Sequence, residues 1–190
     1  MRYVHITYFV HGATIDNERR IASGWNNCEL SDLGKDQSIK LKNKVRSRKF
    51  DFVFCSDLKR SIDSAILTFG DKVPRIQDTR LREINYGDLT KYDSKIVEAL
   101  MLKHIEKPFP NGERYKDVEE KMRSFLKDLL EKYNRKRIAI VGHRATQLAL
   151  EVIINKKTWE QAIKEDWRLK NPKEWKPGWD YNLKEKLISG

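Results

Sequence analysis

The sequence predicts an α/β protein built around a mostly parallel sheet. Three short runs rich in β-branched and aromatic residues, at residues 5–10, 50–55 and 137–141, are each followed by a segment with helical periodicity. Alternating strands and helices are typical of parallel sheets, because parallel neighbours need a crossover connection. The 190 residues suffice for one domain with a substantial core but not comfortably for two, so we expect a single domain over residues 1–190.

Composition narrows the class of partner. The chain is 39% hydrophobic and 35% charged with a net charge of +11, which fits a folded protein that attracts anions. The basic residues are interleaved with acidic and apolar ones, and no nucleic-acid-binding motif is present, so we expect no nucleic-acid partner. The N-terminal apolar run is too short to span a bilayer, and Cys28 and Cys55 match no metal or redox motif. These features predict a cytoplasmic protein with no membrane association.

The first predicted strand, residues 5–10, stops at His11 and Gly12. Ligands bind at the carboxyl edge of parallel sheets, so His11 is expected in a crevice, with Gly12 allowing backbone N–H groups to come close. Asn17 follows within reach of the same turn, and Ser23 and Gly24 form a second small-residue bend. This stretch alone is equally compatible with a strand that ends in an ordinary turn.

The second strand leads to an arginine. A helix is expected to begin after Ser31 as N-cap and to continue to residue 48, before the strand at 50–55. Ser56 then opens another helix, which places Arg60 in the first turn, near the ligand edge if the two strands are parallel neighbours. The apolar residues spaced to face the sheet in this helix are Leu58, Ile62, Ala65, Ile66 and Phe69.

The second half of the chain brings a carboxylate and a second histidine. Glu83 lies in a loop after a short strand at 75–77, and helices are expected over 92–105 and from 112 to 133. The strand at 137–141 runs into His143, which repeats the placement of His11, and a helix follows over 145–154. The tail contains four tryptophans, interpreted either as packing over a sheet edge or as the rim of a pocket, with a loop over 175–179 and a final strand over 180–188.

Two imidazoles, a guanidinium and a carboxylic acid at one sheet edge suit phosphoryl transfer through a histidine. A neutral imidazole can attack phosphorus, while Arg60 and a protonated His143 hold the equatorial oxygens. Glu83 can protonate the departing oxygen and later accept a proton from water. The sequence shows no metal-ligand spacing, so we expect no metal and no other cofactor.

The motifs, taken in order along nearly the whole chain, resemble those of the histidine phosphatase superfamily, the phosphoglycerate-mutase-like group of branch 1. Residues 9–14 with Asn17 resemble the nucleophile motif, and the stretches at 23–25, 30–34, 56–61, 81–83 and 142–143 are similar to the segments that follow it. The resemblance implies a three-layer α/β/α sandwich. It also implies roles for individual residues: His11 as the phosphorylated nucleophile, Glu83 as proton donor, Arg60, His143 and Asn17 as phosphate ligands, and Ser23 as a pocket residue. From their places in the two turns and after the second histidine, Gly12, Gly24 and Arg144 are further candidates for substrate binding.

The departures from the family pattern bear on activity. Val10 stands where the family has an arginine directly before the nucleophile, so one phosphate clamp is missing. By analogy with the loss of an oxyanion donor, we expect this absence to lower the rate on the order of a hundredfold to a thousandfold if nothing replaces the arginine. Arg144, which follows the second histidine where a glycine is usual, is the first candidate to supply a substitute guanidinium, with Arg19 and Arg20 as others.

The predicted function is metal-independent hydrolysis of a small phosphorylated metabolite through a phosphohistidine, with reduced activity if nothing compensates for Val10. A small cap segment is expected at about residues 89–114, and its modest size favours hydrolysis over mutase action. The alternative is a catalytically weakened family member that binds phosphorylated ligands, inorganic phosphate or a protein partner.

Overall fold

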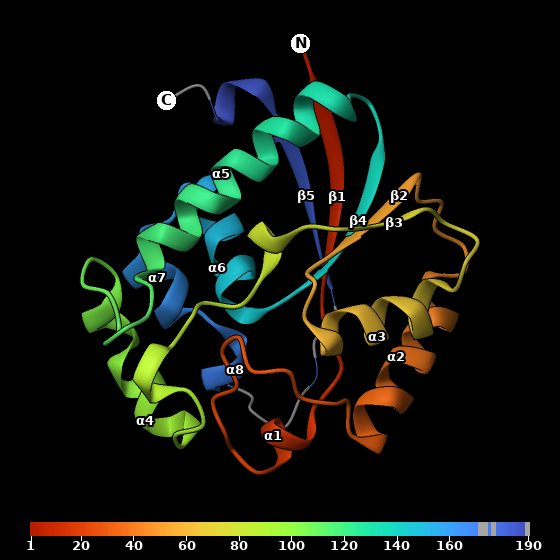
Figure 1. The fold of residues 1–190 in the computed structure, drawn as a ribbon. Coiled ribbons are helices and arrows are strands. Elements are labelled where there is room, and N and C mark those ends of the chain that lie inside the picture. The colour runs from red at the N-terminus through yellow and green to blue at the C-terminus, as the bar shows by residue number, and fades with distance from the viewer. Residues whose placement is uncertain (171–174, 176–177, 189–190) are drawn as a thin grey trace.

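The computed structural model describes residues 1–170, 175 and 178–188, and it contains a five-stranded sheet with helices on both faces (Figure 1). The strand order is β3-β2-β4-β1-β5. Strands β1 to β4 pair in parallel, and β5 runs antiparallel to β1 at one edge. The predicted α/β class with a mostly parallel central sheet is therefore confirmed. The strands are β1 (Tyr3–Val10), β2 (Phe52–Cys55), β3 (Arg75–Gln77), β4 (Arg137–Gly142) and β5 (Gly178–Lys184).

The helices form the two outer layers. In Figure 1, α2 and α3 lie on one side of the sheet, and α5 and α6 lie on the other. Each layer closes a separate cluster of buried apolar side chains against the sheet. The described helices are α1 (Ile15–Glu18), α2 (Asp32–Val45), α3 (Lys59–Phe69), α4 (Ser94–Leu100), α5 (Tyr115–Lys132), α6 (Arg144–Ile153), α7 (Trp159–Lys164) and α8 (Trp167–Lys170). None of the helices among the described residues is long and apolar enough to cross a membrane.

The side chains of β1 and its pairing with β4 fix the carboxyl edge of the sheet. Successive side chains point to opposite faces, so Tyr8 and Val10 join the core beneath α5 and α6, while Phe9 joins the core beneath α2 and α3. Val10 pairs with Gly142 of β4. A Cβ on Gly142 would lie 2.2 Å from the Tyr8 hydroxyl, so this position needs glycine. The pairing aligns the ends of β1 and β4, and with them the residues that follow.

The apolar face predicted for α3 is confirmed at four of its five residues: Leu58 and Ala65 are buried, and Ile62 and Phe69 pack against the cluster beneath α2 and α3. Ile66 is 41% exposed, whereas Ser61, Ser64 and Thr68 are buried. The Ser61 hydroxyl donates to the carbonyl of Val141 at 2.7 Å, so part of this helix face satisfies polar backbone instead of extending the apolar core. A hydrophobic pattern cannot reveal that use, and of the five residues predicted to face the sheet, Ile66 is the one for which the prediction was wrong.

Other differences lie in the cap segment and the tail. The helix predicted over 92–105 is α4 followed by a separate 3₁₀ turn (Met101–His104). Helices α7 and α8 were not predicted; Trp159 at the start of α7 is buried and donates through Nε1 to Glu119 Oε2 at 2.8 Å. Strand β5 begins and ends earlier than the predicted 180–188, and part of the loop expected over 175–179 lies outside the described residues.

Candidate active site

His11 follows β1 directly and has a defined tautomer. Its Nδ1 lies 2.7 Å from the carbonyl oxygen of Gly12. A carbonyl oxygen only accepts, so Nδ1 carries the proton and Nε2 keeps its lone pair. Burial, followed by the positive charges of Arg60 and Arg168, lowers the pKa of His11 to about 3. A neutral imidazole with a free Nε2 is the form that a nucleophile requires.

The second histidine stands beside the first. The ring centroids of His11 and His143 lie 5.0 Å apart. His143 is completely buried, with Nε2 2.7 Å from the Ser56 hydroxyl and no hydrogen-bond partner at Nδ1. Burial, together with the neighbouring Arg60 and His11, holds the pKa of His143 well below its ordinary value.

The expected protonated His143 is thus wrong for the free site. When the Ser56 hydroxyl donates to Nε2, however, a neutral His143 still presents an Nδ1–H donor. The predicted role as an oxygen ligand therefore needs no positive charge on the imidazole.

Arg60 lies in the first turn of α3, as predicted, and is 2% exposed. Its Nη1 donates to the carbonyl of Asn26 at 3.0 Å and its Nη2 to the carbonyl of Gly24 at 2.7 Å. Both contacts fix the guanidinium and leave further N–H donors of its five for an anion. Arg60 lowers the pKa of both His11 and His143, so its positive charge acts on the space between the two rings.

The turn after His11 is held by α3 and α2. The Gly12 N–H donates to the Ser64 hydroxyl at 2.9 Å. A Cβ on Gly12 would lie 2.3 Å from the carbonyl oxygen of Gly34, so only glycine permits this approach to α2. Gly12 was predicted to let backbone N–H groups approach a ligand; the close approach in the structure is to the backbone of α2, and the Gly12 N–H pairs with Ser64.

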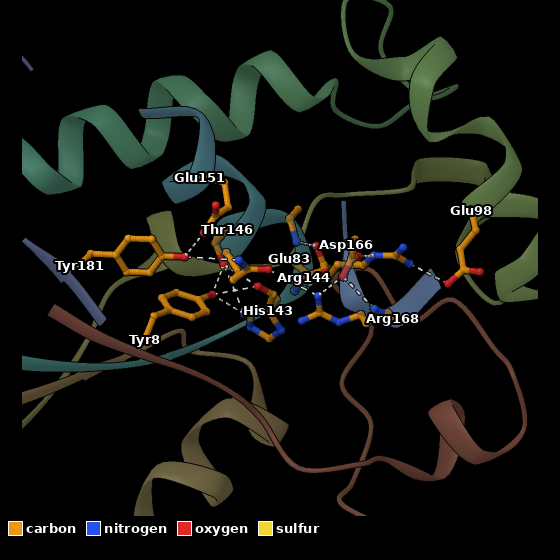
Figure 2. Close-up of polar contacts among 12 residues, drawn as sticks. Tyr8, Glu83, Glu98, His143, Arg144, Thr146, Glu151, Asp166, Arg168 and Tyr181 are labelled. Atoms are coloured by element: carbon orange, nitrogen blue, oxygen red, sulfur yellow. Dashed lines mark hydrogen bonds and ion pairs between the residues drawn. The ribbon is translucent and has the colours of Figure 1, made fainter. Parts of the chain in front are cut away.

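Glu83 reaches the start of α6 (Figure 2). Its Oε1 accepts from the backbone N–H of Ile84 at 2.9 Å and of Ala145 at 3.1 Å, and its Oε2 accepts from that of Arg144 at 3.1 Å. The carboxylate therefore sits on the N-terminus of the helix that begins immediately after His143, where the helix dipole favours negative charge. The structure thus brings Glu83, His143, His11 and Arg60 together.

The remaining predicted pocket residues shape the surrounding loops. Ser23 donates to Asp16 Oδ2 at 2.9 Å, and Gly24, with a φ of +49°, supplies a carbonyl to Arg60. Asn17 is exposed, and its Oδ1 accepts from the N–H of Thr14 at 3.1 Å in the cap of α1. These contacts account for all three residues as local supports.

The arginines considered as substitutes differ in their partners. Arg144 donates from Nε to Asp166 at 2.6 Å and from Nη1 to Glu98 at 2.6 Å, and Arg19 and Arg20 are exposed. Arg168 on α8, which sequence reasoning missed, donates from Nη1 to Asp166 at 2.9 Å and depresses the pKa of His11. Its only sequence signal was its place in the tryptophan-rich tail. Among the described residues, no group of three or more His, Cys, Asp or Glu side chains is arranged to hold a metal ion.

The sheet and the paired histidines at its edge define the class. The chain belongs to the histidine phosphatase superfamily (branch 1), whose family model matches residues 8–174. The predicted membership in this enzyme class, with its phosphoglycerate-mutase-like fold, is confirmed.

The individual relatives include both mutases and phosphatases. The chain is 27% identical over 161 residues to the 2,3-bisphosphoglycerate-dependent phosphoglycerate mutase of Cytophaga hutchinsonii, covering 75% of each protein. It is 30% identical over 143 residues to a broad-specificity phosphatase of Saccharomyces cerevisiae, covering 70% of this chain and 62% of that protein. The structure of a mycobacterial glucosyl-3-phosphoglycerate phosphatase with VO3 has the same fold, with a TM-score of 0.73 at 24% identity over 86% of this chain and 87% of that one.

Proposed function

We propose that the protein is a metal-independent phosphomonoesterase that hydrolyses a small phosphorylated metabolite through a phosphohistidine formed on His11. The observation that carries the proposal is the pair of imidazoles 5.0 Å apart, with Nδ1 of His11 tied to a carbonyl and Nε2 left as a lone pair. Arg60 beside both rings supplies the positive charge that a phosphoryl group needs. Family membership and a phosphatase among the relatives support it further.

The chemistry requires two steps at one phosphorus atom. In the first, His11 Nε2 attacks, the P–N bond forms, the ester P–O bond breaks, and the leaving oxygen takes a proton from Glu83. In the second, water attacks, a P–O bond forms, the P–N bond breaks, and the proton of the water passes to Glu83. Oε2, which accepts one N–H where Oε1 accepts two, is the oxygen with room for that proton. Arg60 and the Nδ1–H of His143 hold the equatorial oxygens throughout.

The cap and the cellular setting are part of the same proposal. We assign residues 89–114, which include α4 and the 3₁₀ turn, as a small covering segment. A mutase must retain and reorient its phosphorylated intermediate, which favours a larger cover, so we assign hydrolysis.

The two cysteines are buried and free, which supports a reducing, cytoplasmic location.

The test is turnover of para-nitrophenyl phosphate by the full chain, with and without a chelator. We expect turnover that a chelator leaves intact and that His11→Ala abolishes, together with an acid-labile phosphoenzyme trapped by rapid quench. His5→Ala is the matched control, because His5 lies on the same strand but bonds to Asn182 at the exposed edge. Turnover that survives His11→Ala, or that disappears with the chelator, contradicts the proposal.

A second function remains open because of Val10. A weakened member of the family would bind phosphorylated ligands or a protein partner without turnover, and a missing clamp at position 10 favours that alternative. Calorimetry with inorganic phosphate separates the two. Binding without any turnover of the aryl ester selects the binding function over hydrolysis.

A further inference from the structure

Among the described residues, five buried nitrogen donors have no hydrogen-bond partner, and some of them belong to the candidate site. These are His143 Nδ1, Arg144 Nη2, Arg168 Nη2, Trp167 Nε1 and Trp175 Nε1. Buried donors are almost always paired, and an unpaired one on a cation is especially costly. Three of the five belong to residues that converge around Asp166 and Glu83 in Figure 2. A cluster of unpaired N–H groups of this kind is what an anion would satisfy.

Arg168 is held firmly although it lies near the end of the described chain. Its backbone N–H and its Nη1 both donate to Asp166 Oδ1, at 3.1 and 2.9 Å. Its guanidinium carbon lies 4.9 Å from the ring centre of Trp167 and 5.9 Å from that of Trp179, within the range of cation–π attraction. The side chain is 18% exposed. These contacts fix one side of the guanidinium and leave Nη2 unpaired.

The contacts of Arg168 direct it to the reacting groups. Nη1 lies 3.5 Å from Oε1 of Gln147, which is on the first turn of α6 and donates its backbone N–H to the carbonyl of His143. The charge of Arg168 also lowers the pKa of His11 and interacts with Glu83. Arg144, by contrast, has two carboxylates of its own, Glu98 and Asp166. Among the residues that the structure describes, Arg168 pairs with one carboxylate, Asp166, so it is the less neutralised of the two.

Val10, which replaces the arginine of the nucleophile motif, lies on the same face of the sheet as Arg168. Val10 faces the core beneath α5 and α6, the layer in which Gln147 meets Arg168. An arginine at position 10 and Arg168 would therefore approach the phosphoryl group from the same face of the sheet.

We infer that Arg168 is the second guanidinium of the phosphate pocket, with Nη2 donating to a phosphoryl oxygen in place of the side chain lost at Val10. The inference rests on the proposed site, but it concerns binding as well as turnover. It assigns α8 to the active site and makes the Asp166 carboxylate a positioning group for Arg168.

The experiment compares Arg168→Gln, Arg168→Lys and the double variant Val10→Arg/Arg168→Gln with the wild type. The matched control is Arg123→Gln, which also removes an arginine from a buried carboxylate, Glu119, but on α5. The measurements are kcat and KM for para-nitrophenyl phosphate, the dissociation constant of inorganic phosphate, and Tm.

We expect Arg168→Gln to lower kcat on the order of a hundredfold to a thousandfold and to weaken phosphate binding, with Arg123→Gln near wild type in both. Arg168→Lys, which keeps the charge without the planar fork, should fall between. Val10→Arg should recover activity in the Arg168→Gln background and add little to the wild type.

Two outcomes overturn the inference. One is a fall in Tm for Arg168→Gln like that of Arg123→Gln, with kcat and phosphate affinity unchanged, which assigns Arg168 a purely structural ion pair. The other is a large gain from Val10→Arg alone, which shows that the clamp was never replaced. If the wild type binds phosphate through Arg168 but turns over no ester, the inference holds and the hydrolytic function fails; if it binds no phosphate, both fail.

Discussion

Replacing Glu83 by glutamine tests the proton donor with little change in shape. Glutamine keeps one carbonyl oxygen, which can still accept the N–H groups of Ile84 and Ala145. It places an amide donor where Oε2 now accepts the N–H of Arg144, so one hydrogen bond to a charged group is lost. The loss of such a bond costs about 1.5–3 kcal/mol of folding free energy. The variant should therefore fold, with a measurable fall in Tm.

The effect on rate should depend on the leaving group. Positioned proton transfer contributes about 10²–10⁴-fold. An alkyl phosphate needs the full proton from Glu83, whereas para-nitrophenolate is stable as an anion and needs little. For Glu83→Gln we expect kcat/KM, which reports formation of the phosphoenzyme, to fall by about 10²–10⁴-fold on an alkyl phosphate such as glycerol phosphate and much less on the aryl ester.

The matched control is Glu113→Gln. Glu113 is also a loop carboxylate that accepts a backbone N–H, that of Asn85 at 2.9 Å, and it pairs with Lys121 at 2.6 Å, but it contacts none of the proposed catalytic groups. It should lower Tm without changing the ratio of the two rates. Equal losses of kcat/KM on the alkyl and aryl esters for Glu83→Gln would refute its assignment as proton donor and leave it as a cap of α6.

The remaining predictions concern the imidazoles and their supports. Ser56→Ala removes the partner of His143 Nε2 and leaves that nitrogen buried and unpaired, so we expect a loss of about 1–3 kcal/mol in urea unfolding and a lower kcat, with KM for the aryl ester raised. The pKa of His11 lies at about 3 in the folded state against 6.5 ordinarily, so between these pH values the unfolded chain binds more protons than the folded one. The free energy of unfolding should therefore fall as pH falls from 7 to 5, which urea unfolding at the two pH values measures. In His11→Asn this pH dependence should be weaker. Tyr8→Phe leaves the backbone N–H of His143 without its 2.7 Å partner, and a Tm equal to that of the wild type would show that Thr146, at 3.2 Å from the same N–H, suffices.

The sequence predicted the parts of the site that local patterns encode. The ends of β1 and β4, with His11 and His143, follow from β-branched runs that stop at small or polar residues, and parallel pairing brings them together. Arg60 follows from helix phase. The charge state of His143 was not predictable, because complete burial between Arg60 and His11 is a tertiary property.

The tail was hidden for a different reason. Helices α7 and α8 are 6 and 4 residues long, too short for periodicity to identify. Arg168 belongs to no sequence motif. It is identified as a candidate site residue by its tertiary contacts with Asp166, Gln147 and two tryptophan rings. In α3 the pattern found most of the apolar face but missed the buried serines, which count as polar in a pattern and here pair with backbone groups.

The charge of the free site is consistent with two guanidiniums and two neutral imidazoles. Arg60 and Arg168 both lower the pKa of His11, and either charge alone would also favour a phosphoryl anion. Protonating His11 would destroy the nucleophile, so a site that binds anions through arginines keeps its nucleophile neutral by the same electrostatic effect. Arginine is the residue type that can do this, because it stays charged when buried, whereas lysine and histidine lose their protons. A guanidinium from α8 can bind the anion and keep His11 neutral as well as one next to His11 in the sequence. Both effects depend on its distance from the phosphoryl oxygens and from His11 Nε2.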